Sequence, residues 1–577
     1  MRTTVAASLP RSTPRAVPRQ QSISDALIGL LADLGVERAF GVIGGAIAPF
    51  FDALGKSRLK VHHLRHESGA AFAAVEAYFA GGRPTLAVCT SGPGLTNALT
   101  GMMSGRWDGA KVVLISGATA TALRGRGPAQ ETSAQTMPYS GLFTAGPLFD
   151  YAVMVESPAE LPQVAFRLAS GLARPGRFVA HVSLPIGVQT APAPGPLPAL
   201  VDGFTAPGIS PEDAGRIARL LSEGPFAIWV GFGARHASAE VRALAEKTGA
   251  PVMCTPRAKG IFPEGHPQFI GVTGLGGHGV DAALARSKPA RILVLGTRLT
   301  ESTCFWQESL APPQGFVHVD LDPDVPGAAF QTVRTLAVQA DVAKFLRALL
   351  PRLPARAAGR ASRTLRLQEP RMAREPRPDG PVRPDVLLEA MQKVVVEGSD
   401  AVVLAESGNA FAWAIHALRF QEPHRFRVNL AFGAMGQAVT GVVGAALARP
   451  GKAVALVGDG AMLMNCELSA AAQYRAPAVW VVLNDGRYGM VAQGMAAQGF
   501  TPCETDFPPV DFVAVARAMG ADGLRVEREA EVEPALALAM AARGPFVVDV
   551  QVDRAIPGPW MKRIQNLILQ GASGKKA

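Results

Sequence analysis

The sequence predicts an α/β protein with three doubly wound, parallel-sheet domains. Apolar runs of strand length alternate with helix-like segments along most of the chain, which indicates parallel sheets covered by helices on both faces. Proline-rich segments divide this alternation into three comparable units. The length of 577 residues is several times that of one domain, and a hydrophobic content of 48% supports large cores and excludes a disordered chain.

The first unit spans residues 22–192 and follows a flexible, basic N-terminal arm at residues 1–21. A helix-like stretch, ISDALIGLLADLGV, begins after Ser22 and leads into a short strand and a glycine turn, AFGVIGG. The strand-like runs that follow are VHHLRHE, TLAVCT, KVVLISG and RFVAHVSLPIGV, with helical segments such as AAFAAVEAYFAGG between them. The proline-rich segment APAPGPLPAL then marks a domain boundary.

The second and third units repeat this alternation. The second spans residues 205–350, and its strand-like runs are FAIWVGFG, PVMCTP, RILVLG and FVHVDLD. A basic linker at residues 351–384 separates it from the third unit at residues 385–560, whose strand-like runs are AVVLAESG, AVALVGDG, AVWVVLND and FVVDVQV. Residues 561–577 are expected to form a C-terminal tail.

Charge and cysteine content restrict the partners and the compartment. The net charge is +10, but the arm and the segment 351–385 contribute nine of these charges and contain no reader motif, so we expect no nucleic-acid partner. No apolar run reaches the roughly 18 residues of a membrane span, and we expect no membrane partner. The five scattered cysteines lack CxxC spacing and are typical of a reducing cytoplasm.

The most informative segment is AVALVGDGAMLMNCELSAAAQYRAPAVWVVLNDGRYGM, residues 452–490. An apolar strand delivers Gly458-Asp459-Gly460 at its carboxyl end, where open α/β sheets bind ligands. Glycines let the backbone approach a phosphate, a following helix offers amides, and Asp459 offers a hard oxygen to a divalent cation. A second buried strand ends at Asn484-Asp485, about 24 residues later. Two such strand ends predict an Mg²⁺–diphosphate site, although a bare GDG is more often a plain tight turn.

This segment resembles the thiamine diphosphate (ThDP) signature of the acetolactate synthase and benzoylformate decarboxylase superfamily. The resemblance covers roughly residues 22–560 and implies ThDP and Mg²⁺ as cofactors. The family usually ends this signature with two asparagines, of which the second binds the metal, and Asp485 stands at that second position. The implied metal ligands are therefore Asp459, Asp485 and the backbone carbonyl of Arg487, with Asn484 as the alternative to Asp485.

Other segments extend the resemblance to the catalytic residues. VHHLRHESGAAFAAVEAYFAGGRPTLAVCTSGPGLTNALTG resembles the family's pyrimidine-binding domain, in which the glutamate of RHE, here Glu67, activates the cofactor. NLAFGAMGQAVTGVVGAALA resembles the stretch whose hydrophobic residue, here Met435, wedges beneath the cofactor and bends it. A carboxylic acid at Glu67 would polarise the aminopyrimidine ring, and the bend would bring that ring to the reactive C2 carbon. Taken alone, Glu67 is more often a surface acid and Met435 ordinary core.

The resemblance also implies a larger set of contacts. The catalytic residues are Glu67, Met435 and Gln130, the last from a family QE pair. The cofactor-binding residues are Glu67, Gly408, Asn409, Met435, Gly458, Asp459, Gly460, Ala461, Asp485, Tyr488, Gly489 and Met490. The substrate-pocket residues are Gly44, Gly45, Ala46, Gln130, Met490 and Gly494, although a plain tight turn explains the first three almost as well.

Two departures from acetolactate synthases bear on function. Those enzymes have a tryptophan four residues after the methionine of GMV, where this chain has Gly494, and the smaller residue implies a wider acceptor pocket. Their flavin-contacting, RFDD-like stretch reads GTRLTESTCFW here (residues 296–306), so we expect no FAD.

The sequence therefore predicts a ThDP-dependent carboligase that decarboxylates a 2-oxo acid and adds the resulting enamine to a second carbonyl, of an aldehyde or ketone. A simple 2-oxo acid decarboxylase is the alternative, and a non-catalytic ThDP-binding protein is a third class that the intact Glu67 and metal positions disfavour. The resemblance also implies a homodimer or homotetramer with the active site at the subunit interface.

Overall fold

A computed structural model describes residues 21–138, 140–195, 197, 204–355 and 377–571. It contains three domains, each built on one six-stranded sheet in which all neighbouring strands are parallel. The fold class predicted from the alternation of strands and helices is therefore confirmed. The predicted arm at 1–21 and linker at 351–384 fall largely outside the described residues. Within the described ranges, no helix is both long and apolar enough to cross a membrane.

The first domain has the strand order β2-β1-β3-β4-β6-β5. Its first helix begins where the sequence predicts, because Ser22 accepts a hydrogen bond from the backbone of Asp25 (3.1 Å) and completes a capping box. The strands are β1 (Arg38–Gly41), β2 (Lys60–His63), β3 (Thr85–Cys89), β4 (Lys111–Ala118), β5 (Tyr151–Met154) and β6 (Phe178–Pro185). The helices are α1 (Ile23–Asp33), α2 (Ala48–Gly55), α3 (Glu67–Gly81), α4 (Pro93–Asp108), α5 (Leu161–Ala173) and α6 (Ile186–Thr190).

The central domain has the order β12-β11-β10-β7-β8-β9. It begins at a helix capped by Ser210, close to the predicted boundary. The strands are β7 (Phe226–Val230), β8 (Val252–Cys254), β9 (Phe269–Val272), β10 (Arg291–Leu295), β11 (Phe316–Asp320) and β12 (Thr335–Gln339). The helices are α7 (Pro211–Ser222), α8 (Ser238–Thr248), α9 (Val280–Ser287), α10 (Glu301–Cys304) and α11 (Val342–Leu349).

The third domain has the order β14-β13-β15-β16-β18-β17. The strands are β13 (Val402–Ala405), β14 (Phe426–Val428), β15 (Ala453–Gly458), β16 (Ala478–Asn484), β17 (Asp522–Val526) and β18 (Phe546–Gln551). The helices are α13 (Pro384–Met391), α14 (Asn409–Ala417), α15 (Gln437–Ala448), α16 (Asp459–Met462), α17 (Leu468–Gln473), α18 (Gly489–Ala497), α19 (Phe512–Ala518), α20 (Val532–Ala541) and α21 (Met561–Leu569). Residues 561–569, expected only as part of a tail, thus form helix α21.

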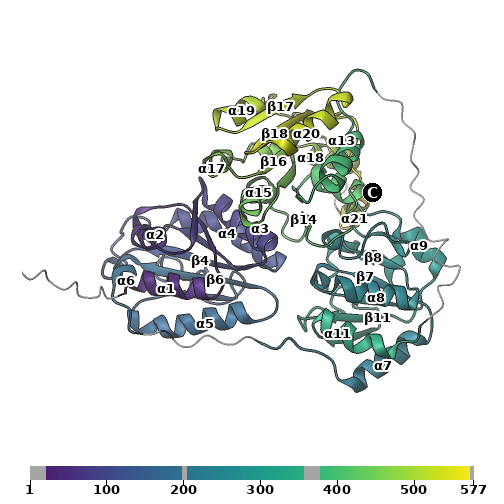
Figure 1. The fold of residues 1–577 in the computed structure, drawn as a ribbon, viewed down its shortest axis with the longest axis horizontal. Helices are drawn as coiled ribbons and strands as arrows, with labels where there is room; N and C mark the ends of the chain where they lie inside the picture. The colour runs from purple at the N-terminus through teal and green to yellow at the C-terminus, as the bar shows by residue number, and fades with distance from the viewer. Residues whose placement is uncertain (1–20, 139, 196, 198–203, 356–376, 572–577) are drawn as a thin grey trace, which may run out of the picture.

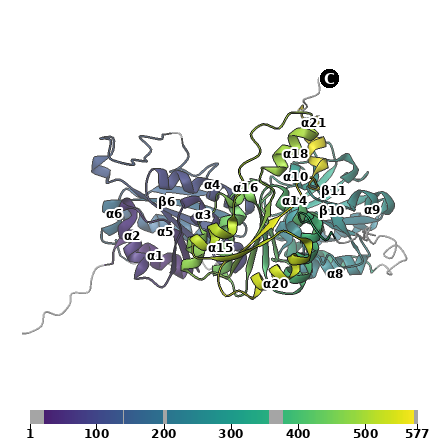
Figure 2. The same ribbon diagram turned by 90° about the horizontal axis from the view of Figure 1, so that it is seen from above.

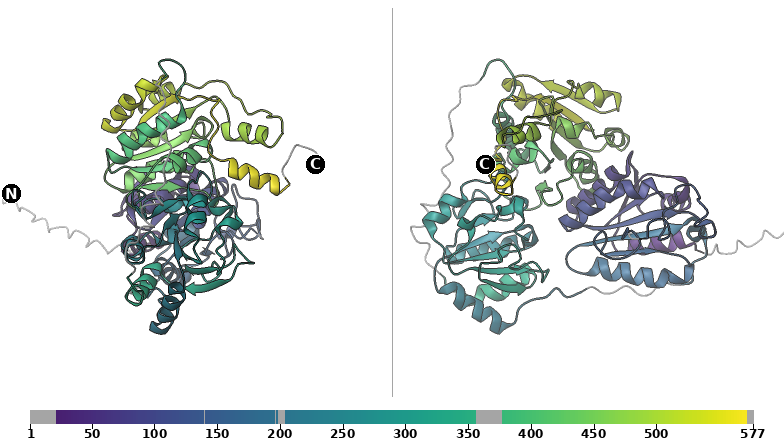
Figure 3. Two further views of the ribbon diagram at one scale, coloured as in Figure 1. Left: turned by 90° about the vertical axis from the view of Figure 1, so that its right-hand side faces the viewer. Right: turned by 180° about the vertical axis from the view of Figure 1, so that it is seen from behind.

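Helix α3 of the first domain packs against α15 of the third, and small residues make this contact close (Figures 1 and 3). A Cβ at Gly444 of α15 would lie 2.0 Å from the carbonyl oxygen of Ala73, and one at Gly441 would lie 2.7 Å from the side chain of Glu76. The alanine-rich sequence of α3 supplies the matching flat surface. The first and third domains are therefore joined through backbone-to-backbone packing that larger residues would prevent.

A buried ion-pair network joins all three domains at one point. Arg427 on β14 donates to Glu76 on α3 (2.9 and 3.0 Å) and to Asp108 at the end of α4 (2.9 Å). Arg257 of the central domain lies 3.4 Å from the same Asp108 carboxylate. Arg427 is 5% exposed, so removing either of its two acidic partners would leave a buried charge that is only partly compensated. The network fixes how the domains meet.

Candidate active site

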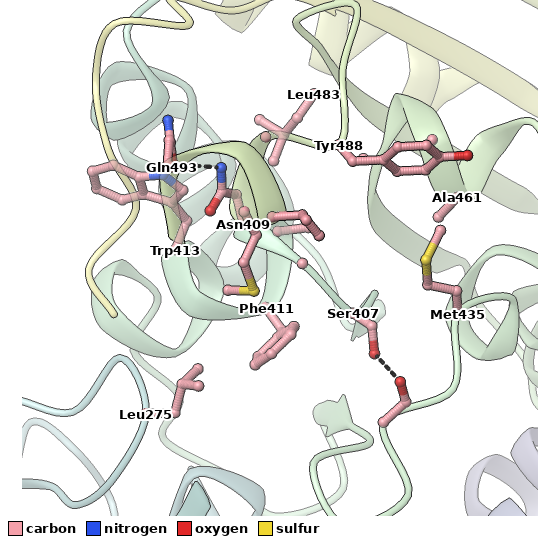
Figure 4. Close-up of a pocket in the computed structure, with 18 of the residues that line it drawn as sticks. Leu275, Ser407, Asn409, Phe411, Trp413, Met435, Ala461, Leu483, Tyr488 and Gln493 are labelled. Carbon is pink, nitrogen blue, oxygen red and sulfur yellow. Dashed lines mark hydrogen bonds between the residues drawn. The ribbon is translucent and has the colours of Figure 1, made fainter. Parts of the chain in front are cut away.

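The carboxyl ends of β13 and β15 meet where the strand order of the third sheet reverses. The chain passes from β13 outward to β14 and then returns to the other side of β13 as β15, which leaves a crevice between the two strand ends. A cavity of about 480 Å³ lies there. It is lined by Ser407–Asn409 after β13, by Gly458–Ala461 after β15 and by Asp485 after β16 (Figure 4).

Asp459 is a buried residue of this cavity wall. Its side chain is 2% exposed and accepts hydrogen bonds from the backbone N–H groups of Gly460 (2.7 Å), Asp485 (3.0 Å) and Gly486 (2.7 Å). Burial, followed by the nearby Asp485 carboxylate, raises the pKa of Asp459 to about 6, and the backbone donors oppose that rise. Burial disfavours the charged form of the Asp459 carboxylate. A cation bound beside it would stabilise that charge.

Asp485 and Asn484 point to opposite sides of the sheet edge. Asp485 lines the cavity, where the guanidinium of Arg487 lies 3.2 Å from its carboxylate. Asn484 is buried and donates to the Asp549 carboxylate (2.8 Å) and to the carbonyl of Val510 (3.2 Å), away from the cavity. Of the two residues that the sequence offered as a second ligand, Asp485 is the one whose side chain is available in the cavity.

Glycines make room around these carboxylates. A Cβ at Gly460 would lie 2.6 Å from the ring of Tyr488, and one at Gly489 would lie 2.7 Å from a carboxylate oxygen of Asp485. Both contacts are closer than real Cβ atoms allow, so a larger residue at either position would displace the Tyr488 ring or the Asp485 carboxylate from its place at the cavity. The GDG and GRYG patterns thus leave room for these two side chains.

Met435 lines the cavity beside Ala461 and precedes α15 (Figure 4). Glu406 controls this segment, because its fully buried carboxylate accepts hydrogen bonds from the backbone of Ala438 and Val439 (2.9 Å each) at the start of α15. Burial raises the pKa of Glu406 to about 7, and these backbone donors oppose the rise. Glu406 itself does not line the cavity.

Comparisons with known proteins agree with this geometry. Three family models match, described as the N-terminal TPP binding domain, the central domain and the C-terminal TPP binding domain of thiamine pyrophosphate enzymes, over residues 21–137, 216–349 and 406–550. A probable acetolactate synthase large subunit of Methanocaldococcus jannaschii is 30% identical over 94% of this chain and 95% of that protein.

The chain belongs to the thiamine pyrophosphate enzymes. The acetolactate synthase large subunit IlvB1 of Mycobacterium tuberculosis is 31% identical over 92% of this chain and 88% of its own length. The isozyme 1 large subunit of Escherichia coli acetolactate synthase is 28% identical over 91% of this chain and 93% of its own length. The resemblance inferred from the sequence is confirmed: this is an acetolactate synthase-like, ThDP-dependent enzyme that acts as a carboligase or decarboxylase.

In this thiamine pyrophosphate enzyme the predicted first-domain residues gather at a separate place. Glu67 begins α3 and accepts a hydrogen bond from Asn97 on α4 (3.0 Å). A Cβ at Gly94 would lie 3.2 Å from the Glu67 carboxylate and 2.8 Å from Thr90, and a Cβ at Gly44 would lie 2.6 Å from the same Thr90. A Cβ at Gly92 would likewise meet Gln130 (2.9 Å). Glu67, the Gly44 turn and Gln130 thus surround one loop.

The segment before Glu67 is held by the third domain of the same chain. Glu467, which is fully buried, accepts hydrogen bonds from the backbone N–H groups of Arg65 (3.0 and 3.1 Å) and His66 (3.0 Å). This contact fixes the start of α3, yet Glu67 does not line the third-domain cavity. In a single copy of the chain, the predicted first-domain residues therefore stay outside the third-domain cavity.

The predicted site residues divide accordingly. Those that line the cavity are Gly408, Asn409, Met435, Gly458, Asp459, Gly460, Ala461, Asp485, Arg487, Tyr488, Gly489 and Met490. Those that do not are Glu67, Gln130, Gly44, Gly45, Ala46, Asn484 and Gly494.

Gly494 faces helix α21 rather than the cavity. A Cβ at this position would lie 3.5 Å from Cδ1 of Ile564, a residue that is 4% exposed. The space that a tryptophan would use is thus filled by a helix that the sequence analysis expected only as a tail. Our expectation of a wider acceptor pocket at Gly494 has no support in this packing.

Sequence reasoning missed much of the cavity wall. Phe411 and Trp413 extend it along α14, and Leu275 comes from the central domain. Gln493 also lines it, and its side-chain oxygen accepts a hydrogen bond from the side-chain amide of Asn409 (3.1 Å, Figure 4). The i+4 spacing of Trp413 from Asn409 on one helix was the signal available for Trp413, whereas Phe411, two residues from Asn409, gave no such signal. Leu275 gave none, since it lies about 130 residues away on another domain.

Residues 296–306, which replace the flavin-contacting stretch of acetolactate synthases, lie at a second cavity between the first and central domains. This cavity measures about 460 Å³, and its lining includes Gly296, Thr297 and Arg298 of the central domain and Trp107 of the first. The altered stretch predicts that the enzyme binds no flavin, and this stays a prediction.

Proposed function

We propose that this enzyme binds ThDP together with Mg²⁺ in the third-domain cavity and joins a decarboxylated 2-oxo acid to a second carbonyl compound. The observation that carries the proposal is the pair Asp459 and Asp485, which line one cavity from the ends of the adjacent strands β15 and β16. Bound ThDP supplies the carbon nucleophile that ordinary side chains cannot provide. The residues of the chain bind, bend and polarise it.

Magnesium would be held by Asp459, Asp485 and the backbone carbonyl of Arg487, all at this cavity. Among the described residues no three His, Cys, Asp or Glu side chains gather at metal-binding distance, so two carboxylates alone would not complete an octahedral shell. A diphosphate would add the missing oxygen ligands. The donor set thus fits an ion that is bound jointly with a phosphate-bearing cofactor, and the amides at the start of α14 face the same crevice.

Glu67 would act from a second copy of the chain. It does not line the cavity of its own chain, and large apolar side chains are exposed both at the cavity, on Phe432 (38%), and on Leu463 (50%), Met464 (51%) and Ile43 (52%). Apolar surface of this kind is typical of a protein interface. A two-fold dimer, or a tetramer built from it, would bring Glu67 of one copy to the cofactor of the other.

Met435 would wedge beneath the cofactor, and its position is braced by Glu406 through the start of α15. Glu67 would then hold the proton that polarises the pyrimidine ring. The substrates are 2-oxo acids with a ketone or aldehyde acceptor, and no flavin takes part, so a flavin absorbance band in the purified enzyme would contradict that assignment. The five free cysteines, three of them buried, support a cytoplasmic location.

The test is a product assay with purified enzyme, ThDP and Mg²⁺. Pyruvate with 2-oxobutyrate or propanal is expected to give coupled products with a new C–C bond. Free acetaldehyde as the sole product would instead identify a simple decarboxylase, and binding of ThDP without any turnover of a panel of 2-oxo acids would identify a non-catalytic protein. Metal removal by a chelator is expected to abolish both ThDP binding and turnover.

A further inference from the structure

We infer that Arg563 on helix α21 binds the carboxylate of the acceptor and so selects 2-oxo acids over aldehydes. This inference rests on the proposed carboligase function. Helix α21 lies against α18 and α10 (Figure 2). Arg563 lines the cavity from this helix. A 2-oxo acid carries one negative charge next to its keto carbon, so its binding site requires a cation beside the reacting atoms.

The charged residues of the cavity wall leave one candidate. Among the described residues, the wall has four carboxylates and two guanidinium groups, those of Arg487 and Arg563. Arg487 is already engaged, since it lies 3.2 Å from Asp485 and also donates to the backbone carbonyl of Arg554. In the part of the chain that the structure describes, the guanidinium of Arg563 has no hydrogen-bond or ion-pair partner. Among the residues that the structure describes at this cavity, it is the cation that is available to a ligand.

The carboxylates near Arg563 are themselves occupied. Glu301 of α10 accepts hydrogen bonds from Asn566 (2.6 Å) and Gln570 (3.1 Å) of α21. Asp553 pairs with Arg377 at 2.7 Å. Because these acids have other partners, they do not neutralise the guanidinium of Arg563. The rest of the wall carries net negative charge, so an anionic ligand is repelled there and attracted to Arg563.

Helix α21 does not depend on Arg563 for its position. It is held by Ile564, which is 4% exposed and packs at Gly494, by the Asn566 contact to Glu301, and by the ion pair of Lys562 with Asp281 of α9 (2.5 Å). A substitution at Arg563 therefore removes charge from the cavity while leaving these contacts intact.

The chemistry favours the acceptor over the donor as the ligand of Arg563. The donor carboxylate leaves as CO₂ and loses its charge, so a strong ion pair to it would stabilise the ground state and slow the reaction. The acceptor carboxylate is unchanged. A bond forms between the donor carbonyl carbon and the acceptor keto carbon, the bond to CO₂ breaks, and the acceptor oxygen takes one proton. A cation beside the acceptor carboxylate therefore stabilises the bound acceptor both before and after the new bond forms.

The experiment compares two acceptors that share an ethyl group and differ by one carboxylate, 2-oxobutyrate and propanal, with pyruvate as the donor. The ratio of the two coupled products in competition is measured by mass spectrometry. In Arg563→Gln this ratio is expected to shift about 10- to 100-fold toward the propanal product, and Arg563→Lys is expected to recover part of it. Arg528→Gln, which removes an exposed guanidinium outside the cavity, is the control and should keep the wild-type ratio.

A second readout does not depend on turnover. Arginine modification by 1,2-cyclohexanedione, mapped by mass spectrometry, should be slowed at Arg563 by 2-oxobutyrate and not by propanal in the ThDP-loaded enzyme. Titration of ThDP against Arg563→Gln should give the wild-type affinity, which shows that the variant is folded. An unchanged product ratio in a variant that binds ThDP would overturn the role of Arg563 alone. A wild-type enzyme that makes neither coupled product would overturn the proposed function and this inference with it.

Discussion

The Asp459 carboxylate accepts a hydrogen bond from the backbone N–H of Asp485 at 3.0 Å, so the ends of strands β15 and β16 are joined through the residue that we assign to the metal. The same oxygen accepts from Gly486 at 2.7 Å. Asp459 therefore holds the second loop in place and also presents charge to the cavity. A change at Asp459 would affect both the metal and the position of its other ligand.

Asp459→Ala should weaken ThDP binding in the presence of Mg²⁺ by about 100-fold or more, because a hard anionic ligand and its loop contacts are lost together. The affinity is measured from the quenching of tryptophan fluorescence, since Trp413 lines the cavity. Asp553→Asn is the matched control, as that cavity carboxylate pairs with Arg377. Wild-type affinity in Asp459→Ala would remove the metal assignment.

Mixing two inactive variants tests whether the site is shared between copies. If Glu67 and Asp459 of one site come from different chains, a heterodimer of Glu67→Gln and Asp459→Ala has one intact site. Random reassociation of equal amounts should then recover roughly a quarter of wild-type activity. Light scattering should show at least a dimer. No recovery on mixing, with exchange of subunits verified, would mean that both residues act within one chain.

Gly494→Trp should displace α21, because the indole would need the space of Ile564. Overpacking of this kind costs about 1–3 kcal/mol, and we expect a lower melting temperature together with reduced kcat/KM for small and large acceptors alike. Adding Ile564→Ala should recover part of both losses, and Gly494→Ala should be tolerated. A selective loss with large acceptors at an unchanged melting temperature would instead show that Gly494 faces the acceptor.

His181 should make stability depend on pH. Its Nδ1 donates to the carbonyl of Leu142 (2.6 Å) and its Nε2 accepts from Ser116 (2.8 Å), inside the first-domain core. Burial lowers the pKa of His181 to about 4, so the folded state stays neutral while the unfolded state takes up a proton below about pH 6.5. The stabilisation is complete above pH 6.5 and is lost as the pH falls toward 4.

For this one residue the free energy of unfolding should fall by about 2 kcal/mol between pH 7 and pH 5. Melting temperatures measured across that range should drop less steeply in His181→Gln than in the wild type. Parallel slopes would mean that the imidazole of His181 is not the titrating group.

In the third domain, four of the six strands could be predicted from the sequence and two could not. Strands β13, β15 and β16 are nearly continuous apolar runs buried on both faces, and β18 is a similar run interrupted by Asp549, so composition alone identifies them. Strands β14 and β17 were not predicted, because β14 has three residues, one of them Arg427, and β17 reads DGLRV at the edge of the sheet. Their strand character comes from the neighbours that they pair with.

The residues of the candidate site also fall into those that a local motif predicts and those that depend on tertiary packing. Asp459 and Asp485 were predictable because their motifs sit at strand ends, and parallel strand ends meet at one edge. The relation between Gly494 and Ile564 was not predictable, since it depends on how a C-terminal helix folds back over α18. Arg563 was missed for the same reason, as was the brace from Glu406 to the start of α15, which no local pattern encodes.

The most direct measurement is hydrogen–deuterium exchange at C2 of ThDP bound to Glu67→Gln, because it reports on activation of the cofactor before any substrate enters. Glutamine keeps the size of the side chain and cannot supply a strongly polarising acid. Exchange and turnover should both slow by about 10²–10⁴, while ThDP affinity changes little because diphosphate and metal carry most of the binding. Wild-type exchange in the variant would contradict the role of Glu67, and with it the account of how this enzyme activates ThDP.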